Sequence, residues 1–304
     1  MKKNQLGTSD LFVSKLGLGC MSLGTDEIKA KEIIKAALAE GINYFDTADL
    51  YDFGVNEEIV GKSLKSVRDQ VIIASKVGNR WNSEKTSWNW DPSKTYIKEA
   101  VKDSLHRLQT DYIDLYQLHG GTIQDTIDET IEAFEELKNE GLIRYYGISS
   151  IRPNVIREYI QKSNIISVML QYSLLDRRAE ENVLPLLKEN SISAVTRGPL
   201  AKGILSGKIL EKAMNKGYMD YTFEELNELV KNIQSKLLKN NRTMTEFAIQ
   251  YNLSHESVAS VIAGASSVNQ VKENANAVRA NPLSEEERNI LLALTKQTYY
   301  IEHR

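Results

Sequence analysis

The chain has 304 residues, of which 41% are hydrophobic and 26% are charged, a composition typical of an ordered globular protein. Its formal net charge is -3, so the chain has no excess of positive charge to attract the phosphates of a nucleic acid, which argues against such a partner. The single cysteine, Cys20, excludes an internal disulfide and a thiolate metal cluster, so no metal site is expected. The sequence contains neither a signal-peptide pattern nor 18 consecutive apolar residues, which predicts a cytoplasmic protein without a membrane partner.

Short apolar runs alternate with longer amphipathic stretches along the chain, a pattern typical of repeated β/α units with a parallel sheet. A small hairpin is predicted first, at 5–13. Eight predicted strands follow, at 16–20, 42–48, 71–77, 113–119, 143–149, 167–172, 193–197 and 258–265. Helical patterns follow each strand, for example over 125–140. Helices are also predicted at 223–238 and 243–253 in the longer seventh unit, with an extra C-terminal helix at 283–294.

Eight such units predict an α/β fold, a (β/α)8 TIM barrel that forms a single domain over 1–304, with the hairpin at its amino-terminal end. An open, doubly wound sheet is the alternative. Its dinucleotide-binding form needs the spacing G-x-G-x-x-G after the first strand. Gly17, Gly19 and Gly24 do not have this spacing, which favours the closed barrel.

Four titratable side chains stand where consecutive predicted strands end. Asp46 and Tyr51 follow the second strand, Lys76 ends the third and His119 ends the fourth. Barrel enzymes build their active sites at this end of the strands, so we expect the four side chains to meet. Such a group suits reduction of a carbonyl, in which the tyrosine gives a proton to oxygen. The lysine would lower the tyrosine pKa, the aspartate would keep the lysine charged, and the histidine would donate to the substrate oxygen.

Each of these residues also has a structural interpretation, as a turn cap, a snorkelling lysine, a surface tyrosine or a hydrogen-bonding histidine. Lys76 and His119, however, lie within apolar runs, where an ionisable group is costly unless it has partners. Their joint placement at one end of neighbouring strands favours the catalytic interpretation.

Longer patterns around these residues resemble the aldo-keto reductase family over nearly the whole chain. The segment FDTADLY at 45–51 with Asn56 and Glu57, the pair SK at 75–76 and the segment QLH at 117–119 are similar to the family's four catalytic segments. The resemblance implies that Tyr51 is the general acid and that His119 orients the carbonyl. It also implies an oxidoreductase that reduces aldehydes or ketones to alcohols with NADPH, taking a small-molecule carbonyl substrate.

The resemblance extends to segments that would bind the cofactor. Segment 147–150 and Gln171 resemble the residues that hold the nicotinamide carboxamide, with Ser150 in place of the usual asparagine. The loop after the seventh strand resembles one that wraps the pyrophosphate. The cofactor-binding residues implied in this way are Gly19, Cys20, Met21, Asp46, Ser149, Ser150, Gln171, Arg197, Gly198, Pro199, Leu200, Ala201, Lys202, Gly203, Ser206, Lys208, Gly264, Ser266, Gln270, Glu273 and Asn274.

Two positions depart from the family's common pattern. Arg197 stands where an aromatic residue usually stacks on the nicotinamide, and it offers a planar guanidinium instead. Ser266 and Gln270 stand near the 2′-phosphate, where many relatives have an arginine. No acidic residue occupies that place and Lys208 adds positive charge, so NADPH rather than NADH is the expected cofactor.

The longest strand-end loop, 79–93, contains all three tryptophans of the chain. Trp81, Trp88 and Trp90 are expected to line the substrate site together with Tyr51 and His119. The alternative is that the tryptophans anchor this loop to the barrel rim. Tyr299 and Tyr300, near the C-terminus, are further candidates for the substrate wall.

Two other functions remain open at this point. The strand-seven and adenosine segments also resemble those of potassium-channel β subunits, which suggests a nucleotide-sensing regulatory subunit with weak turnover. A dehydrogenase that works toward alcohol oxidation would use the same site. The complete set of Tyr51, Lys76, Asp46 and His119 argues against the sensor, whereas the direction of the reaction does not follow from the sequence. The substrate and the oligomeric state do not follow from the sequence.

Overall fold

The structure is a computed structural model, and it describes residues 1–207, 217–238 and 242–304. Eight strands close into a parallel barrel in the order β10-β11-β12-β3-β4-β5-β8-β9. This arrangement confirms the predicted (β/α)8 barrel. The barrel strands are β3 (Leu16–Gly19), β4 (Tyr44–Asp46), β5 (Ile72–Val77), β8 (Ile113–Leu118), β9 (Ile143–Ser149), β10 (Ser167–Gln171), β11 (Ser193–Arg197) and β12 (Val258–Gly264).

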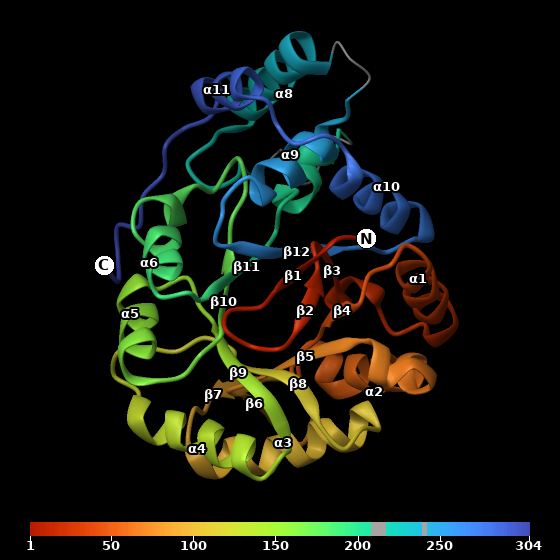
Figure 1. Ribbon diagram of the computed structural model, residues 1–304, viewed down its shortest axis with the longest axis vertical. Coiled ribbons are helices and arrows are strands. Elements are labelled where there is room, and N and C mark those ends of the chain that lie inside the picture. The colour runs from red at the N-terminus through yellow and green to blue at the C-terminus, as the bar shows by residue number, and fades with distance from the viewer. Residues whose placement is uncertain (208–216, 239–241) are drawn as a thin grey trace.

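Helices surround the barrel on its outside (Figure 1). Along the chain they are α1 (Glu27–Ala39), α2 (Val55–Leu64), α3 (Lys94–Leu108), α4 (Ile127–Asn139), α5 (Pro153–Lys162), α6 (Val183–Glu189), α8 (Phe223–Leu237), α9 (Met244–Leu253), α10 (Val268–Arg279) and α11 (Glu285–Leu294). Most of these helices bury one apolar stripe, whereas α9 is buried on nearly all sides. In α4, for example, Ile127, Ile131, Phe134 and Leu137 are buried at steps of three and four residues.

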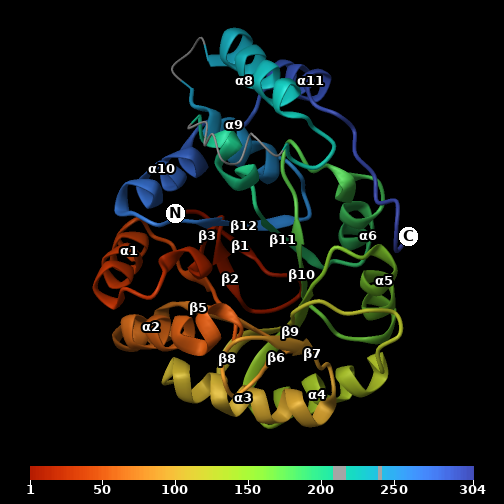
Figure 2. The ribbon, with the colours of Figure 1, turned by 180° about the vertical axis from the view of Figure 1, so that it is seen from behind.

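The predicted N-terminal hairpin is confirmed. Strands β1 (Lys3–Gln5) and β2 (Phe12–Ser14) pair antiparallel, and the hairpin lies against the barrel (Figure 2). Its buried residues Leu6, Leu11 and Val13 pack with side chains of the barrel interior. The backbone N–H of Gly7 donates to the hydroxyl of Ser193, the first residue of β11. The hairpin therefore closes the amino-terminal end of the barrel and leaves the carboxyl-terminal end for a binding site.

The segment predicted as a long loop over 79–93 contains regular structure that the sequence pattern did not indicate. Strands β6 (Asn79–Trp81) and β7 (Trp88–Trp90) pair antiparallel and form a hairpin outside the barrel sheet. Far from this hairpin along the chain, α8 and α11 lie side by side in both ribbon views (Figures 1 and 2). These two helices correspond to the additions predicted around 223–238 and 283–294.

Candidate active site

A cavity of about 1320 Å³ opens where the barrel strands end. Every strand of the barrel contributes its last residue, or the one beside it, to the cavity lining: Gly19, Asp46, Lys76, His119, Ser149, Gln171, Arg197 and Gly264. A parallel barrel brings all carboxyl ends of its strands to one rim, and this geometry gathers residues that lie far apart in the chain. The cavity has the location that the sequence predicts for the active site.

The four titratable residues singled out in the sequence meet at this cavity. The side chain of Lys76 is buried, and its Nζ lies 2.7 Å from Asp46 Oδ1 and 2.7 Å from the carbonyl oxygen of Thr47. The same nitrogen lies 3.4 Å from the hydroxyl of Tyr51. The ring of His119 meets that of Tyr51 edge-on, with 5.9 Å between the ring centroids. The structure therefore places a cation, its carboxylate partner, a phenol and an imidazole around one point.

The surroundings keep Lys76 charged and Tyr51 protonated. Burial by itself lowers the pKa of Lys76, but the nearby Asp46 and Tyr51 more than offset it, so the pKa is raised. Burial raises the pKa of Tyr51, and Lys76 opposes this without reversing it. The expectation that Lys76 brings the Tyr51 pKa below its ordinary value is therefore wrong in its net direction. Tyr51 holds its proton at neutral pH and is available as an acid.

His119 is neutral in this environment. Burial first, and then the positive charges of Lys76 and Arg197, lower the pKa of its imidazole to about 3. Its backbone N–H donates to the carbonyl of Val77, while its buried Nδ1 has no hydrogen-bond partner among the described residues. A neutral imidazole can donate one hydrogen bond to a ligand without adding charge.

A strained turn holds Tyr51 at the cavity. Asp52, Phe53 and Gly54 follow it directly and have φ angles of 48°, 50° and 88°, in the left-handed region that side-chain-bearing residues rarely adopt. The ring of Phe53 stacks on Trp81, with 5.5 Å between centroids and 8° between the ring planes. The β6–β7 hairpin therefore packs against the turn that carries Tyr51.

A second buried ion pair supports the same region. The side chain of Glu57, on α2, accepts from Arg107 Nε at 2.7 Å and from the hydroxyl of Ser75, which precedes Lys76. Asn56, beside it, links the hydroxyl of Thr47 to the carbonyl of Cys20. Asn56 and Glu57 thus hold the segments that carry Asp46 and Lys76 and do not themselves line the cavity.

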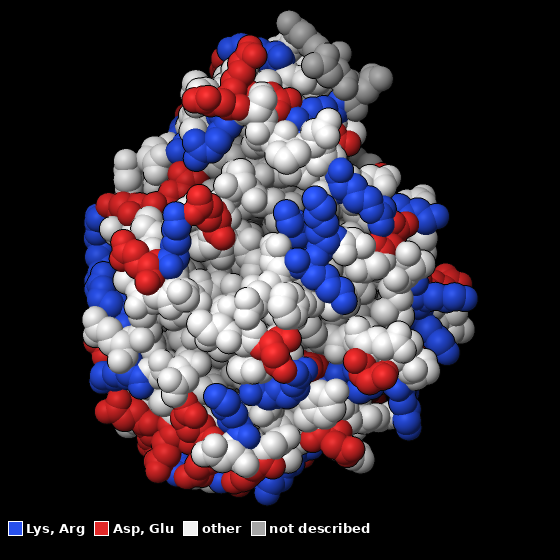
Figure 3. Space-filling view, viewed as in Figure 1, with Lys and Arg blue, Asp and Glu red and all other residues white. Residues whose placement is uncertain are grey.

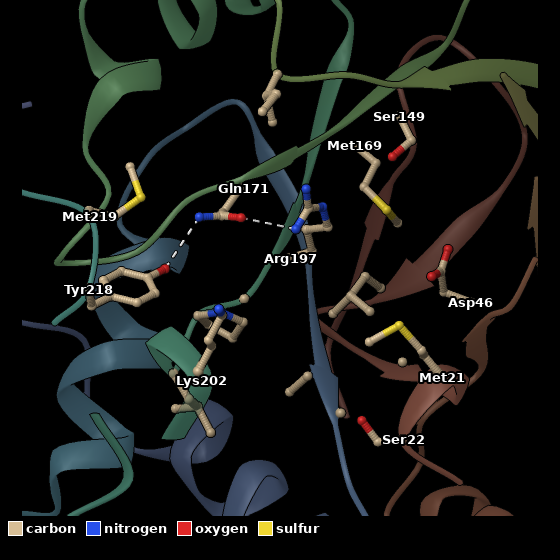
Figure 4. A pocket seen from close by; sticks show the side chains of 18 of the residues that line it. Met21, Ser22, Asp46, Ser149, Met169, Gln171, Arg197, Lys202, Tyr218 and Met219 are labelled. Carbon is tan, nitrogen blue, oxygen red and sulfur yellow. Dashed lines mark hydrogen bonds between the residues drawn. The ribbon is translucent and has the colours of Figure 1, made fainter. Parts of the chain in front are cut away.

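The opposite wall of the cavity comes from the ends of β9, β10 and β11. Gln171 accepts from Arg197 at 3.1 Å, and its amide nitrogen donates to Asp176 at 2.8 Å and to the hydroxyl of Tyr218 at 3.3 Å. Figure 4 shows Gln171 between Tyr218 and Arg197, with Ser149 and Asp46 farther along the cavity. This side presents amide and hydroxyl groups that suit a carboxamide-bearing ligand.

The loop after β11 has a backbone that suits an anion. Gly198, Lys202 and Gly203 have φ angles of 70°, 58° and 93°, and all three line the cavity. Turns of this kind direct successive N–H groups into a concave site for phosphate oxygens. Lys208, also predicted here, lies outside the described residues. In Figure 3, one face of the molecule is hollowed and basic side chains gather along one border of the hollow, a charge distribution that favours an anionic ligand.

The start of α10 forms the far end of the cavity. Ser267 caps this helix by accepting from the N–H of Gln270, and Gln270 in turn accepts from the N–H and the hydroxyl of Ser266. Asn274, one turn on, donates to the carbonyl of Gly264 at 3.4 Å. A helix N-terminus with exposed hydroxyl and amide groups is a suitable place for a phosphate.

Most of the residues predicted to bind the cofactor line this cavity. Besides the predicted residues already described, the lining includes Met21, Ser150, Pro199, Leu200, Ser206 and Glu273. Cys20 and Ala201 do not line it, and both are fully buried. Burial also raises the pKa of the Cys20 thiol well above its ordinary value.

The three tryptophans do not line the cavity. Trp81 stacks on Phe53, as described above, and Trp88 is half exposed on β7. Trp90 donates from its indole nitrogen to Asp125 at 3.0 Å and lies close to Gly78 and Gly120. These positions favour the interpretation in which the tryptophans anchor the hairpin to the barrel rim.

Several lining residues were not predicted. Tyr218, Met219 and Asp220 reach the cavity from the segment before α8, and Arg152 and Arg178 reach it from the segments after β9 and β10. The C-terminal residues 299–303 also line it, including the two tyrosines suggested by the sequence. A tyrosine pair in an otherwise polar tail was the only signal for this wall.

A (β/α)8 barrel whose open end gathers a tyrosine, a buried lysine–aspartate pair and a histidine beside a long cavity defines a carbonyl oxidoreductase. The model of the aldo/keto reductase family matches residues 15–296. The chain belongs to this family, whose members use a nicotinamide cofactor.

Relatives cover the whole chain. The protein described as uncharacterized oxidoreductase YqkF of Bacillus subtilis (strain 168) is 58% identical over 308 residues, covering 100% of both chains. The NADH-specific methylglyoxal reductase of Escherichia coli (strain K12) is 32% identical, covering 92% of this chain and 94% of its own. The structure of aldo-keto reductase AKR11C1 from Bacillus halodurans in its holo form superposes with a TM-score of 0.95 at 60% identity, covering 100% and 99% of the two chains.

None of the helices in the described residues is long and apolar enough to cross a membrane. Within the same ranges, no group of three or more histidine, cysteine, aspartate or glutamate residues is arranged to hold a metal ion.

Proposed function

We propose that the protein is an NADPH-dependent reductase of aldehydes or ketones in which Tyr51 is the general acid. The observation that carries this proposal is the position of the Tyr51 hydroxyl, 3.4 Å from a buried lysine ammonium that is itself paired with Asp46 at 2.7 Å. A phenol held beside a fixed positive charge can release its proton to a substrate oxygen, because the phenolate that remains is stabilised. We take residues 1–304 as one domain and expect it in the cytoplasm, where the single buried thiol of Cys20 stays reduced.

Each side chain has a distinct part in the reaction. When bound, the reduced nicotinamide supplies a hydride to the carbonyl carbon. Tyr51 gives its proton to the carbonyl oxygen, which leaves an alcohol. Lys76 stabilises the phenolate, and Asp46 keeps the lysine charged in a buried site, as the raised pKa of Lys76 indicates. His119, which is neutral, donates a hydrogen bond that orients the carbonyl oxygen.

The cavity residues fit a dinucleotide along its length. Ser149, Ser150 and Gln171 would hold the carboxamide, and the left-handed turns of the loop after β11 would hold the pyrophosphate. Ser266 and Gln270, with α10, would hold the adenosine end. We favour NADPH because neither of these two residues is acidic, so neither side chain repels the 2′-phosphate. The NADH-specific relative from Escherichia coli makes this preference the part of the proposal that most needs measurement.

The test is steady oxidation of NADPH by the purified protein with a panel of aldehydes, compared with Tyr51→Phe. We expect the substitution to lower kcat by roughly 10²- to 10⁴-fold, because general acid catalysis contributes about that much. The affinity for NADPH, measured by fluorescence titration, should change less than about twofold. Tight NADPH binding by the unmodified protein without turnover would contradict the proposal and favour the nucleotide-sensing alternative.

A further inference from the structure

Three arginines line the cavity, and they differ in their partners. Arg178 donates to both carboxylate oxygens of Asp176, at 2.7 and 2.8 Å, so its charge is neutralised. Arg197 donates to the side-chain oxygen of Gln171 at 3.1 Å. Arg152 donates from one terminal nitrogen to the carbonyl of Gly121 and, within the described parts of the chain, pairs with no carboxylate. Among the described residues, Arg152 and Arg197 therefore both bring a charge to the cavity without a carboxylate partner, and Arg197 is the one that stands where the nicotinamide is expected.

Arg152 lies where the proposed cofactor residues at the end of β9 meet the segment that carries His119. The residue follows β9 and caps the start of α5, while its guanidinium reaches Gly121, two residues beyond His119. Gly120, between them, also lines the cavity. The guanidinium thus links the start of α5 to the segment after β8, which also carries His119.

The cofactor does not need this arginine. Its phosphates are assigned above to the loop after β11 and to the start of α10, and α10 lies on the opposite side of the barrel from α5 in both ribbon views (Figures 1 and 2). The charge of Arg152 is therefore available to the second ligand of the cavity, the carbonyl compound.

The chemistry of the guanidinium indicates what that ligand carries. An arginine has five N–H donors in one plane, and Arg152 uses one nitrogen for the Gly121 carbonyl, so donors remain for a planar two-oxygen acceptor. A carboxylate matches this geometry through paired, charge-assisted hydrogen bonds. A doubly charged phosphate fits less well, because the acidic residues Asp220 and Glu302 line the same cavity.

We propose that Arg152 binds the carboxylate of an oxo acid whose carbonyl is reduced beside Tyr51 and His119. The preferred substrates are then aldehydes or ketones that also carry a carboxylate, and not their neutral counterparts. This inference rests on the proposed function and names its substrate class.

The first experiment compares 4-oxobutanoate and 5-oxopentanoate with their methyl esters, which keep the aldehyde and remove the charge. The unmodified protein should show the higher kcat/KM with the acids. Arg152→Gln should lower kcat/KM for the acids by at least about tenfold and for the esters by less than about twofold. Arg152→Lys, which keeps the charge but loses the planar fork, should restore part of the preference.

Arg157→Gln is the matched control, because Arg157 lies on the same helix but is exposed and does not line the cavity. Arg157→Gln should leave kcat/KM unchanged for the acids and for the esters. If Arg152→Gln lowers activity equally with acids and esters, Arg152 only supports the loop of Gly121 and the inference is wrong. An unchanged preference in Arg152→Gln would overturn it as well. In both cases the reductase function stands, since the unmodified protein turns over aldehydes.

A binding measurement separates this inference from the reaction itself. Calorimetric titration of the NADP+-loaded protein with butanoate should show binding that butanamide, which is uncharged, lacks, and Arg152→Gln should remove it. If the protein shows this binding without turnover, the inference holds while the reductase proposal fails. If butanoate and butanamide bind alike, the inference fails whatever the activity.

Discussion

The hydroxyl of Tyr51 lies 3.4 Å from Nζ of Lys76, a side chain that is fully buried beneath the cavity. This ammonium is the cation that lowers the pKa of the phenol most, and Arg197 adds a smaller effect in the same direction. The stability of the site and its chemistry are therefore linked through Lys76.

The first prediction concerns the ion pair of Lys76 with Asp46. Lys76→Met should lower the free energy of unfolding at pH 7 by about 3 to 5 kcal/mol, because it leaves a carboxylate buried without its cation. Urea denaturation followed by circular dichroism measures the change.

The control for this prediction is the double variant Lys76→Met with Asp46→Leu, in which neither charge remains. It should be more stable than Lys76→Met alone, because the uncompensated carboxylate is gone. Equal stability of the two variants would mean that the loss comes from packing and not from the charge.

The second prediction is a pH dependence caused by His119. Its pKa is about 3 in the folded protein, below its ordinary value of 6.5, so only the unfolded chain takes up the proton in this interval. The stability due to a neutral His119 is thus complete above about pH 6.5 and is lost as the pH falls toward 3, by about 1.4 kcal/mol per pH unit. In His119→Gln, the free energy of unfolding, measured by urea denaturation between pH 6 and 4, should fall less steeply with decreasing pH, by about 1.4 kcal/mol per pH unit. Parallel profiles of the two proteins would contradict the assignment.

The third prediction concerns Trp81, which stacks on Phe53 in the strained turn after Tyr51. Trp81→Ala removes this support and should lower kcat by about 10- to 100-fold, since small displacements of a reacting group are costly. KM for the aldehyde and the affinity for NADPH should change much less. Trp88→Ala, at a half-exposed position of the same hairpin, is the control and should behave like the unmodified protein. A rise in KM without a fall in kcat would instead indicate that Trp81 forms a substrate wall.

The fourth prediction tests the choice between NADPH and NADH. Gln270→Glu keeps an oxygen that can accept from the N–H and the hydroxyl of Ser266, so the start of α10 should stay intact. The added negative charge should weaken NADPH binding by about tenfold through repulsion of the 2′-phosphate and leave NADH binding within about twofold. Fluorescence titration with both cofactors measures the two constants. A similar loss for both would place the 2′-phosphate away from Gln270.

The barrel and the meeting of the four titratable residues could be predicted because both follow from local patterns. Alternating apolar runs indicate β/α units, and a closed parallel sheet brings strand ends together, so Asp46, Lys76 and His119 needed no knowledge of packing. The β6–β7 hairpin could not be predicted in this way, because each of its strands has only three residues and pairs only with the other.

Other features depend on three-dimensional packing that no sequence pattern encodes. Arg152 and Tyr218 reach the cavity from segments outside the strands, so their role depends on where those segments lie around the barrel. The direction of the Tyr51 pKa shift depends on the balance of burial and Asp46 against the cations Lys76 and Arg197, and the sequence does not show the extent of burial. For the same reason, the sequence does not show that Cys20 and Ala201, although adjacent to lining residues, are fully buried.

The cavity divides along the barrel, with Asp46, Lys76 and His119 on β4, β5 and the end of β8, and most of the dinucleotide positions on β9 to β12 and α10. The continuous ladder of strand hydrogen bonds fixes these two arcs relative to each other, whatever the sequence of the connecting segments. Substitutions can therefore change the residues that recognise the carbonyl compound while the residues proposed to bind the cofactor stay in place. In a barrel of this kind, the residues of one arc can change without displacing those of the other.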